Sequence, residues 1–187
     1  YMHKPIFTST VIGMLNECLG KDSYSKKETE VKRASDVGIF TGRRILLVED
    51  IALNRDIVKS LLEETGVEIH EASDGQAACD MFRSNPKKFD LILMDIQMPV
   101  MDGYAATRAI RGGMELPEAA SIPIIAMTAD VFREDIERCK ESGMNAHIAK
   151  PINSTEMVRT LKKYLPPRTP HARQREFATL NEEPVYS

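Results

Sequence analysis

Residues 91–103 read Leu91-Ile92-Leu93-Met94-Asp95-Ile96-Gln97-Met98-Pro99-Val100-Met101-Asp102-Gly103. The four apolar residues at the start of this stretch predict a short strand buried on both faces, as strands of parallel sheets are. Asp95 follows at the carboxyl end of that strand, and a helix is expected over 104–110. The stretch therefore predicts a parallel sheet that presents a carboxylate where its strands end.

Segments of the same two kinds alternate on both sides of this stretch. We expect further strands over 44–48, 67–72, 123–127 and 146–149. We expect further helices over 54–65, 131–141 and 154–165, and a loop over 112–121. Another helix is expected after the turn Ser73-Asp74-Gly75; it carries Ala77, Ala78, Met81 and Phe82, and Asn85-Pro86 ends it. In the first helix, Ile57, Val58, Leu61 and Leu62 form the apolar stripe expected to face the core. Five alternating strands and helices predict an α/β fold, a doubly wound five-stranded parallel sheet of the (βα)5 kind.

The flanks of this pattern differ from its middle. Residues 21–33 are charged and almost free of apolar side chains, which is typical of a linker. Pro166 and Pro167 end the last helix. We therefore predict a linker over 21–42, the sheet domain over 43–166 and a tail over 167–187.

An internal repeat links the first residues to the end of the sheet domain. Lys4-Pro5-Ile6 and the apolar residues that follow it mirror Lys150-Pro151-Ile152 and its apolar residues at a constant offset of 146. We interpret residues 1–20 as the last strand, loop and helix of a preceding domain of the same kind. An unrelated amphipathic helix is the alternative.

Composition narrows the class of protein. The chain has 187 residues, 42% hydrophobic and 28% charged, the balance of an ordinary globular protein. Its net charge of -3 argues against nucleic-acid binding, and no apolar run approaches the roughly 20 residues that cross a bilayer. Cys18, Cys79 and Cys139 are expected to be buried thiols in a reducing compartment. We expect a cytoplasmic location without membrane contact by this segment, and a membrane-anchored parent protein stays open.

Polar side chains follow four of the predicted strands. Glu49 and Asp50 follow the first strand, Asp95 the third, Thr128 the fourth and Lys150 the fifth. In open parallel sheets the ligand site lies beyond the carboxyl ends of the strands, so we expect these residues to gather. Each has a bland alternative, namely a solvated turn for the acids, a turn residue for the threonine and a surface charge for the lysine. Their joint occurrence in this order indicates a site.

The three carboxylates predict a divalent cation. Like charges held close together disfavour ionisation unless a cation neutralises them. A hard ion with oxygen ligands, Mg²⁺ above all, suits Glu49, Asp50 and Asp95. Beside such an ion Asp95 is a candidate nucleophile toward phosphorus, while Thr128 offers a hydroxyl and Lys150 a positive charge.

Four motifs resemble those of response-regulator receiver domains, the family of the chemotaxis regulator. They are Leu-Val-Glu-Asp at 47–50, Met-Asp-Ile-Gln-Met-Pro-Val-Met-Asp-Gly at 94–103, Pro-Ile-Ile-Ala-Met-Thr-Ala at 123–129 and Lys-Pro at 150–151. The resemblance runs from 43 to 165 and covers about two thirds of the chain. It implies flavodoxin-like strand order and phosphorylation of Asp95 in a two-component phosphorelay.

The resemblance also implies roles for single residues. Asp50 and Asp95 would bind Mg²⁺ through carboxylates, Glu49 through water and Gln97 through its backbone carbonyl. The phosphoryl group would be contacted by Thr128, by Lys150 and by the backbone N–H groups of Ile96 and Ala129. The bond between Lys150 and Pro151 is expected to be cis.

His147 departs from the family pattern. Receivers usually place at this position a Tyr or Phe that changes rotamer on activation. His147 is either a smaller, polar form of that switch, acting with Thr128, or simply a residue at the edge of a strand. No cluster of metal-binding residue types surrounds it in the sequence.

The resemblance points to the receivers that are fused to hybrid sensor histidine kinases. The partner would be a histidine kinase or a histidine phosphotransfer domain, and a dimer stays open. The receiver would promote its own phosphorylation, and the parent chain would be a kinase with two receivers in tandem. A degenerate receiver that only binds proteins is the alternative. A haloacid-dehalogenase phosphatase is disfavoured, because the nucleophile of that class follows the first strand and Asp95 follows the third.

Overall fold

In the computed structural model of this chain, the described residues are 36–114, 116–129 and 133–165. The chain divides into two compact units, residues 1–37 and 38–187, and nearly all described residues belong to the second. The upstream remnant expected over 1–20, most of the linker, the 167–187 tail and Cys18 lie outside the described residues. Within the described part, no helix is both long and apolar enough to cross a membrane.

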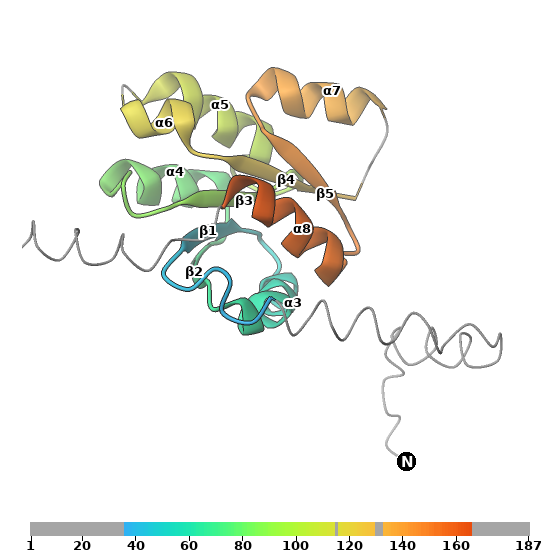
Figure 1. Cartoon of the computed structure of the whole chain (residues 1–187). Helices are drawn as coiled ribbons and strands as arrows, with labels where there is room; N and C mark the ends of the chain where they lie inside the picture. The colour runs from blue at the N-terminus through green and yellow to red at the C-terminus, as the bar shows by residue number, and fades with distance from the viewer. Residues whose placement is uncertain (1–35, 115, 130–132, 166–187) are drawn as a thin grey trace, which may run out of the picture. The chain divides into compact units, whose positions relative to one another are not determined.

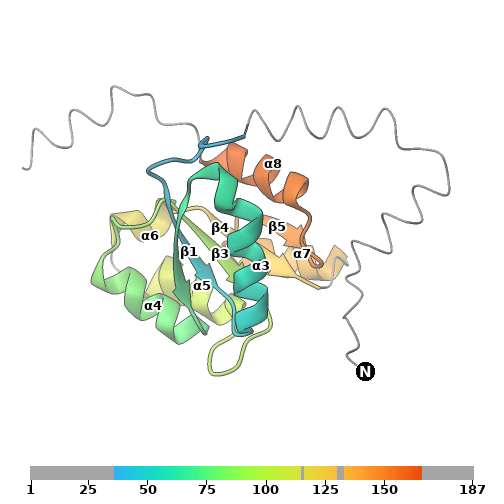
Figure 2. The same cartoon turned by 90° about the horizontal axis from the view of Figure 1, so that it is seen from below.

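Five strands of the described chain form one parallel sheet (Figures 1 and 2). They are β1 (Arg44–Val48), β2 (Glu68–Ala72), β3 (Leu91–Asp95), β4 (Ile124–Thr128) and β5 (Ala146–Ala149). Their order across the sheet is β2-β1-β3-β4-β5, and every neighbouring pair is parallel. This is the flavodoxin-like order, with its switch point between β1 and β3. The predicted α/β fold is confirmed, with strand ends that shift by one residue at most.

Helices cover both faces of the sheet. They are α3 (Ala52–Leu62), the 3₁₀ turn η1 (Glu63–Thr65), α4 (Gly75–Ser84), α5 (Gly103–Gly113), α6 (Pro117–Ser121), α7 (Arg133–Ser142) and α8 (Ser154–Tyr164). Buried residues of α4, α5, α6 and α7 join one apolar cluster, and those of α3 and α8 join another. Figure 1 accordingly shows α4, α5 and α7 on the opposite side of the sheet from α3.

Alternate residues of each central strand build these two cores. In β3, Ile92 and Met94 belong to the cluster under α4 and α5, while Leu91 and Leu93 belong to the cluster under α3 and α8. All four side chains are fully buried. Burying one such side chain contributes about 1.5–3 kcal/mol, so a strand that is apolar on both faces favours the interior position that β3 occupies.

Side-chain caps start helices beside the carboxyl edge of the sheet. The Oδ1 atom of Asp74 accepts a hydrogen bond from the N–H of Ala77 at 2.8 Å, and Oδ1 of Asp102 accepts one from Ala105 at 2.7 Å. Asn153 caps α8 in the same way. Each cap contributes about 1 kcal/mol and fixes where a helix leaves its strand-end loop.

The loop expected over 112–121 instead contains the end of α5 and the whole of α6. Glycine and proline predict an irregular segment here, but Pro117 lies in the first turn of α6, where its missing N–H has no helical partner to lose. Arg111 ties this region together, since its Nη1 donates to the carbonyl of Ala119 at 2.7 Å and its Nε to that of Gly143 at 3.0 Å.

Ile57 was expected in the core and is 45% exposed. Val58 and Leu62 are fully buried, and Leu61 is half-buried. Successive residues lie about 100° apart around a helix, so a buried stripe centred on Val58 and Leu62 leaves Ile57 outside it.

The linker ends earlier than the predicted residue 42. Phe40 is fully buried in the core beside α3 and α8. Its N–H donates to the carbonyl of Thr65 at 2.9 Å, and that of Gly38 donates to Glu64 at 2.8 Å. Residues 38–42 therefore belong to the sheet domain.

Candidate functional site

Side chains at the ends of β1 and β3 meet the lysine that follows β5. The Nζ atom of Lys150 lies 2.7 Å from Oε2 of Glu49 and 2.8 Å from Oδ2 of Asp95. Glu49 is fully buried, and Asp95 is 4% exposed at the end of β3. The sequence separation of 101 residues between Lys150 and Glu49 shows that the sheet topology, and not a local turn, creates this contact.

Glu49, Asp50 and Asp95 form an acidic cluster. Each offers one carboxylate oxygen, and the three oxygens lie within 4.8 Å of one another. Three carboxylates against the single ammonium of Lys150 leave an excess of negative charge in a largely buried place. Hard oxygen ligands with unbalanced charge are the donor set that Mg²⁺ takes, so these residues fit that ion.

Burial sets the ionisation of the site. It raises the pKa of the Asp95 carboxyl, and the neighbouring carboxylate of Glu49 raises it further, while Lys150 and a backbone hydrogen bond from Gln97 lower it. Burial also disfavours the charged form of Lys150, but hydrogen bonds to Asp95 and Glu49 more than offset this and hold its pKa above the ordinary value. Lys150 is therefore a permanent cation, and a bound divalent ion would favour ionised Asp95.

Glu49 is held at both of its carboxylate oxygens. Lys150 contacts Oε2, and Nδ2 of Asn54 donates to Oε1 at 2.8 Å. The N–H of Ile51 also approaches Oε1, at 3.4 Å. A carboxylate with these partners on both oxygens has a fixed orientation, which suits contact with a metal through water more than direct ligation.

Gly103 lets α5 begin directly against the phosphoacceptor candidate. A Cβ atom at this position would collide with the backbone carbonyl of Asp95. The N–H of Gly103 donates to the carbonyl of Ile96 at 3.0 Å and closes the turn after β3. Only glycine therefore allows this close approach without a shift of the backbone.

The residues after Asp95 differ in one respect from the expected cradle. The N–H of Ile96, expected to contact a phosphoryl group, donates to the carbonyl of Met127 at 3.2 Å and belongs to the sheet. The backbone hydrogen bond to the Asp95 carboxyl comes from Gln97, whose side chain is exposed. The Gln97 amide is thus better placed than that of Ile96.

The remaining site residues lie on β4 and β5. Thr128 is buried at the end of β4, and Ala129 follows it with an exposed side chain. His147 is half-buried on β5, opposite Ala126 of β4. The peptide bond between Lys150 and Pro151 is cis.

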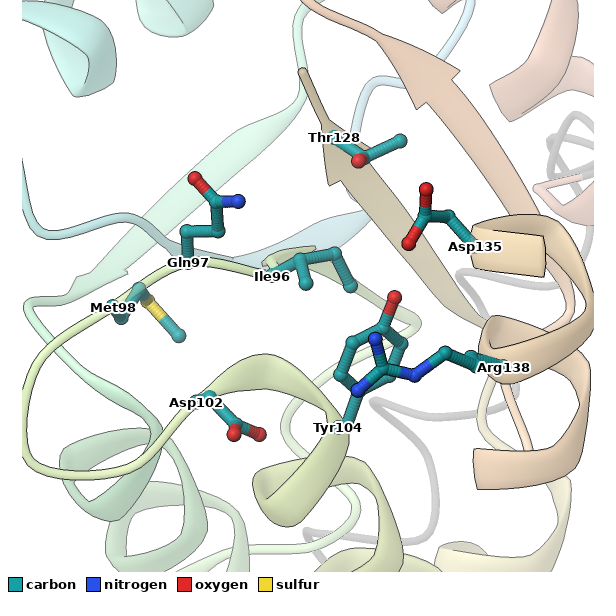
Figure 3. A pocket seen from close by; sticks show the side chains of 8 residues that line it. All are labelled: Ile96, Gln97, Met98, Asp102, Tyr104, Thr128, Asp135 and Arg138. Atoms are coloured by element: carbon teal, nitrogen blue, oxygen red, sulfur yellow. The ribbon is translucent and has the colours of Figure 1, made fainter. Parts of the chain in front are cut away.

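A pocket of about 410 Å³ opens beside Thr128 (Figure 3). Its lining residues are Ile96, Gln97, Met98, Asp102, Tyr104, Thr128, Asp135 and Arg138. The guanidinium carbon of Arg138 lies 4.9 Å from the centre of the Tyr104 ring. Burial raises the pKa of Tyr104 to about 12, so its phenol is neutral. Because Thr128 lines this pocket together with Asp135 and Arg138 of α7, it has open space on the side of α7.

Comparison with known proteins decides the family. A family model described as the response regulator receiver domain matches residues 45–162. The chain belongs to the response regulator receiver family. Among curated relatives of this receiver is hybrid signal transduction histidine kinase I of Dictyostelium discoideum, 38% identical over 147 residues, which span 75% of this chain and 8% of the kinase. The chain spans less than a fifth of the length of the first curated relatives it matches.

Two solved structures are similar to this receiver. The receiver domain of sensor histidine kinase PA1611 from Pseudomonas aeruginosa PAO1, with magnesium coordinated in its active site cleft, is 38% identical with a TM-score of 0.60. The match covers 67% of this chain and 98% of that one. The receiver of Ssk1, in complex with the histidine phosphotransfer protein Ypd1 of Saccharomyces cerevisiae, is 28% identical with a TM-score of 0.61 and coverages of 68% and 91%.

Sequence reasoning missed two residues of the receiver site. The sequence analysis assigns no role to Asn54 or Arg55, yet Asn54 holds Glu49 and Arg55 contacts the backbone of Glu49 and Asp50. The available signal was their position in the first turn of a helix that starts directly after the acids. Side chains there point back toward the preceding loop.

Proposed function

We propose that this receiver takes a phosphoryl group from a phosphohistidine onto Asp95 in a two-component phosphorelay. One observation carries the proposal: the buried Asp95 carboxylate lies 2.8 Å from the Lys150 ammonium and within the acidic cluster of Glu49 and Asp50. A neighbouring cation and an acidic metal site serve to position the phosphoryl group and neutralise its charge during transfer to a carboxylate.

In the proposed reaction, one Oδ atom of Asp95 attacks the phosphorus atom. An acyl phosphate bond forms, the P–N bond to the donor imidazole breaks, and the imidazole leaves with the electron pair. The Lys150 ammonium exchanges one of its carboxylate contacts for a phosphoryl oxygen, and the Thr128 hydroxyl donates to another. Mg²⁺, held by Asp50 and Asp95 and by Glu49 through water, would neutralise charge on the phosphoryl oxygens.

The product carries a signal because it changes the charge of the strand-end cluster. An added phosphate brings roughly -1.5 to -2 units of charge and three strong acceptors. Thr128 would move toward it from the pocket side, and the surface of α7, β5 and α8 would shift between two arrangements. His147 lies on β5 within that surface, which makes it a candidate for the residue that follows Thr128.

Exposed apolar side chains next to the acidic cluster favour a protein as the phosphodonor. Ile51 is 53% exposed, Leu53 67% and Val100 87%, and Ile51 directly follows Asp50. Isolated apolar residues are ordinary at surfaces, but Ile51 and Leu53 follow the acids after β1 and Val100 lies in the loop after Asp95. We propose that a histidine kinase or histidine phosphotransfer domain packs on them, and that the parent chain is itself a hybrid histidine kinase.

Intact mass spectrometry tests the proposal. The chain is incubated with acetyl phosphate, with and without Mg²⁺, beside an Asp95→Asn variant. We expect one added phosphoryl group in the wild type with Mg²⁺ and none in the variant. An equal gain in both proteins would overturn the assignment of Asp95. No gain in either would favour the degenerate receiver that only binds proteins.

A further inference from the structure

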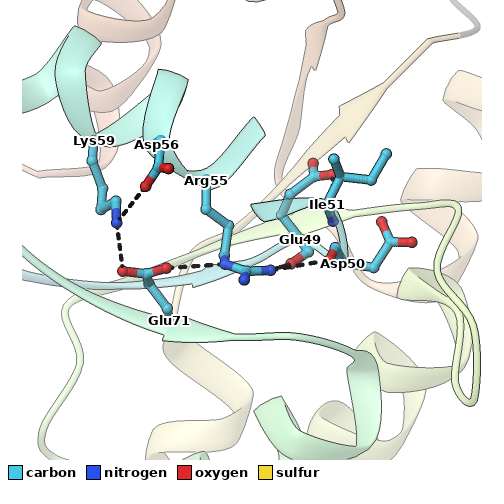
Figure 4. A network of polar contacts seen from close by, with 7 residues as sticks. All are labelled: Glu49, Asp50, Ile51, Arg55, Asp56, Lys59 and Glu71. Carbon is cyan, nitrogen blue, oxygen red and sulfur yellow. Dashed lines mark hydrogen bonds and ion pairs between the residues drawn. The ribbon is translucent and has the colours of Figure 1, made fainter. Parts of the chain in front are cut away.

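A second charged network joins side chains of α3 and β2 to the residues that follow β1 (Figure 4). Nη1 of Arg55 donates to the backbone carbonyl of Glu49 at 2.7 Å and to that of Asp50 at 3.1 Å. Nε of Arg55 donates to Oε2 of Glu71 at 3.0 Å. One guanidinium thus joins the two acidic residues after β1 to the neighbouring strand.

These two carbonyl groups belong to the residues that supply two of the three carboxylates of the cluster. A carbonyl that is fixed by a charged donor fixes the peptide plane, and the peptide planes decide where the two side chains point. The guanidinium suits this task because its planar fork presents donors in fixed directions, which a flexible ammonium cannot do. The side chain of Arg55 is 19% exposed, so solvent screens these contacts only in part.

Glu71 and Lys59 hold Arg55 in place. Lys59 Nζ lies 2.9 Å from Oε1 of Glu71 and 2.8 Å from Oδ1 of Asp56. A hydrogen bond from Lys59 lowers the pKa of the Glu71 carboxyl, together with the charge of Arg55. The carboxylate therefore stays ionised and pulls the guanidinium toward β2 while its Nη1 faces the β1–α3 loop.

We propose that Arg55 is a positioning residue for metal binding: it orients the peptide groups of Glu49 and Asp50 so that their carboxylates converge with Asp95. Arg55 touches neither the metal nor the phosphoryl group in this account. The effect of Arg55 on metal binding rests on the proposed function, whereas its ordering of the β1–α3 loop does not.

Metal titration of the full chain gives the first test. Arg55→Ala is compared with Arg83→Ala, a matched control that removes an exposed arginine paired with Asp80 on α4. Calorimetry with Mg²⁺ is expected to show about tenfold weaker binding for Arg55→Ala, the usual scale for a residue that orients a ligand, and no change for the control. Arg55→Lys should fall between them, because an ammonium cannot contact Glu71 and both carbonyls with the same geometry.

The kinetic readout separates positioning from general damage. With acetyl phosphate as donor, Arg55→Ala should need more Mg²⁺ to reach half its maximal phosphorylation rate, yet reach nearly the wild-type rate at saturating Mg²⁺. A variant with normal Mg²⁺ dependence and a lowered maximal rate would overturn the positioning role.

Hydrogen exchange without metal keeps the inference separate from the proposed function. Peptides that cover residues 49–53 should exchange faster in Arg55→Ala than in Arg83→Ala, with the rest of the sheet unchanged. If wild type binds no Mg²⁺, the proposed function fails while this readout still decides the role of Arg55. Unchanged exchange in 49–53 overturns the inference. Should Arg55→Ala not fold, Arg55→Lys carries the same comparison.

Discussion

The two sides of the candidate site are built differently. On the β1 side, Glu49 has partners at both carboxylate oxygens, and Arg55 holds the backbone of the loop. On the β4 side, Thr128 borders a pocket of about 410 Å³. The acidic side of the site is therefore held by several polar contacts, whereas Thr128 borders the open space that its proposed movement requires.

Loss of the central cation should have the largest effect. Lys150→Met leaves the fully buried Glu49 without its ammonium partner, and removing one member of a buried pair costs about 3 kcal/mol or more. Urea unfolding without metal measures this, with the exposed Lys163→Met as control. Mg²⁺ should restore part of the loss, and a stability equal to that of the control would show that the buried charges are not coupled.

A matched glycine pair in α5 tests the close approach at the site. Gly103→Ala places a methyl group against the carbonyl of Asp95 and should lower the unfolding free energy by about 2 kcal/mol. Gly112→Ala meets nothing within 4 Å and should raise it by about 0.5–1 kcal/mol, since alanine favours a helix. Thermal unfolding of both variants should show opposite shifts, and equal shifts would contradict the packing described here.

A pH titration of stability reports on Asp95. Its pKa is raised in the folded protein, so its stabilising contribution is fully present below the unfolded value near 3.8 and is lost as the pH rises through the folded value. Metal-free wild type should therefore lose stability over that range relative to Asp95→Asn. Parallel pH curves for the two proteins would mean that burial does not perturb this carboxyl.

The pocket side should tolerate change best. Arg138→Ala removes a cation from the face of the Tyr104 ring at an exposed position, which costs about 0.5–1 kcal/mol. The effect should be smaller than that of Lys150→Met and should leave Mg²⁺ affinity unchanged. A large loss of Mg²⁺ affinity would show that the pocket side also holds the metal site in place.

Most strands and helices could be predicted from the sequence because they depend on local patterns of apolar residues. Apolar runs such as Leu91–Met94 predict buried strands, and the residues after them fall at the carboxyl edge in any parallel sheet. The positions of Glu49, Asp50, Asp95, Thr128 and Lys150 follow from that rule alone.

What could not be predicted depends on contacts between distant residues. Phe40 looked like part of a linker, and only its burial against α3 and α8 assigns it to the domain. In the helix at Pro117, the carbonyl of Ala119 accepts a hydrogen bond from Nη1 of Arg111, a contact that no local pattern predicts. The role of Arg55 requires Glu71 of the neighbouring strand, which no local pattern reveals.

Mapping the acyl phosphate tests whether Asp95 receives the phosphoryl group. The chain is phosphorylated with Mg²⁺ and acetyl phosphate and then treated with borohydride, which reduces an acyl phosphate to an alcohol. Peptide sequencing by mass spectrometry should find homoserine at position 95 and unmodified acids at 49 and 50. Homoserine at position 50, or an unmodified Asp95 in a protein that gained phosphoryl mass, would show that Asp95 is not the acceptor.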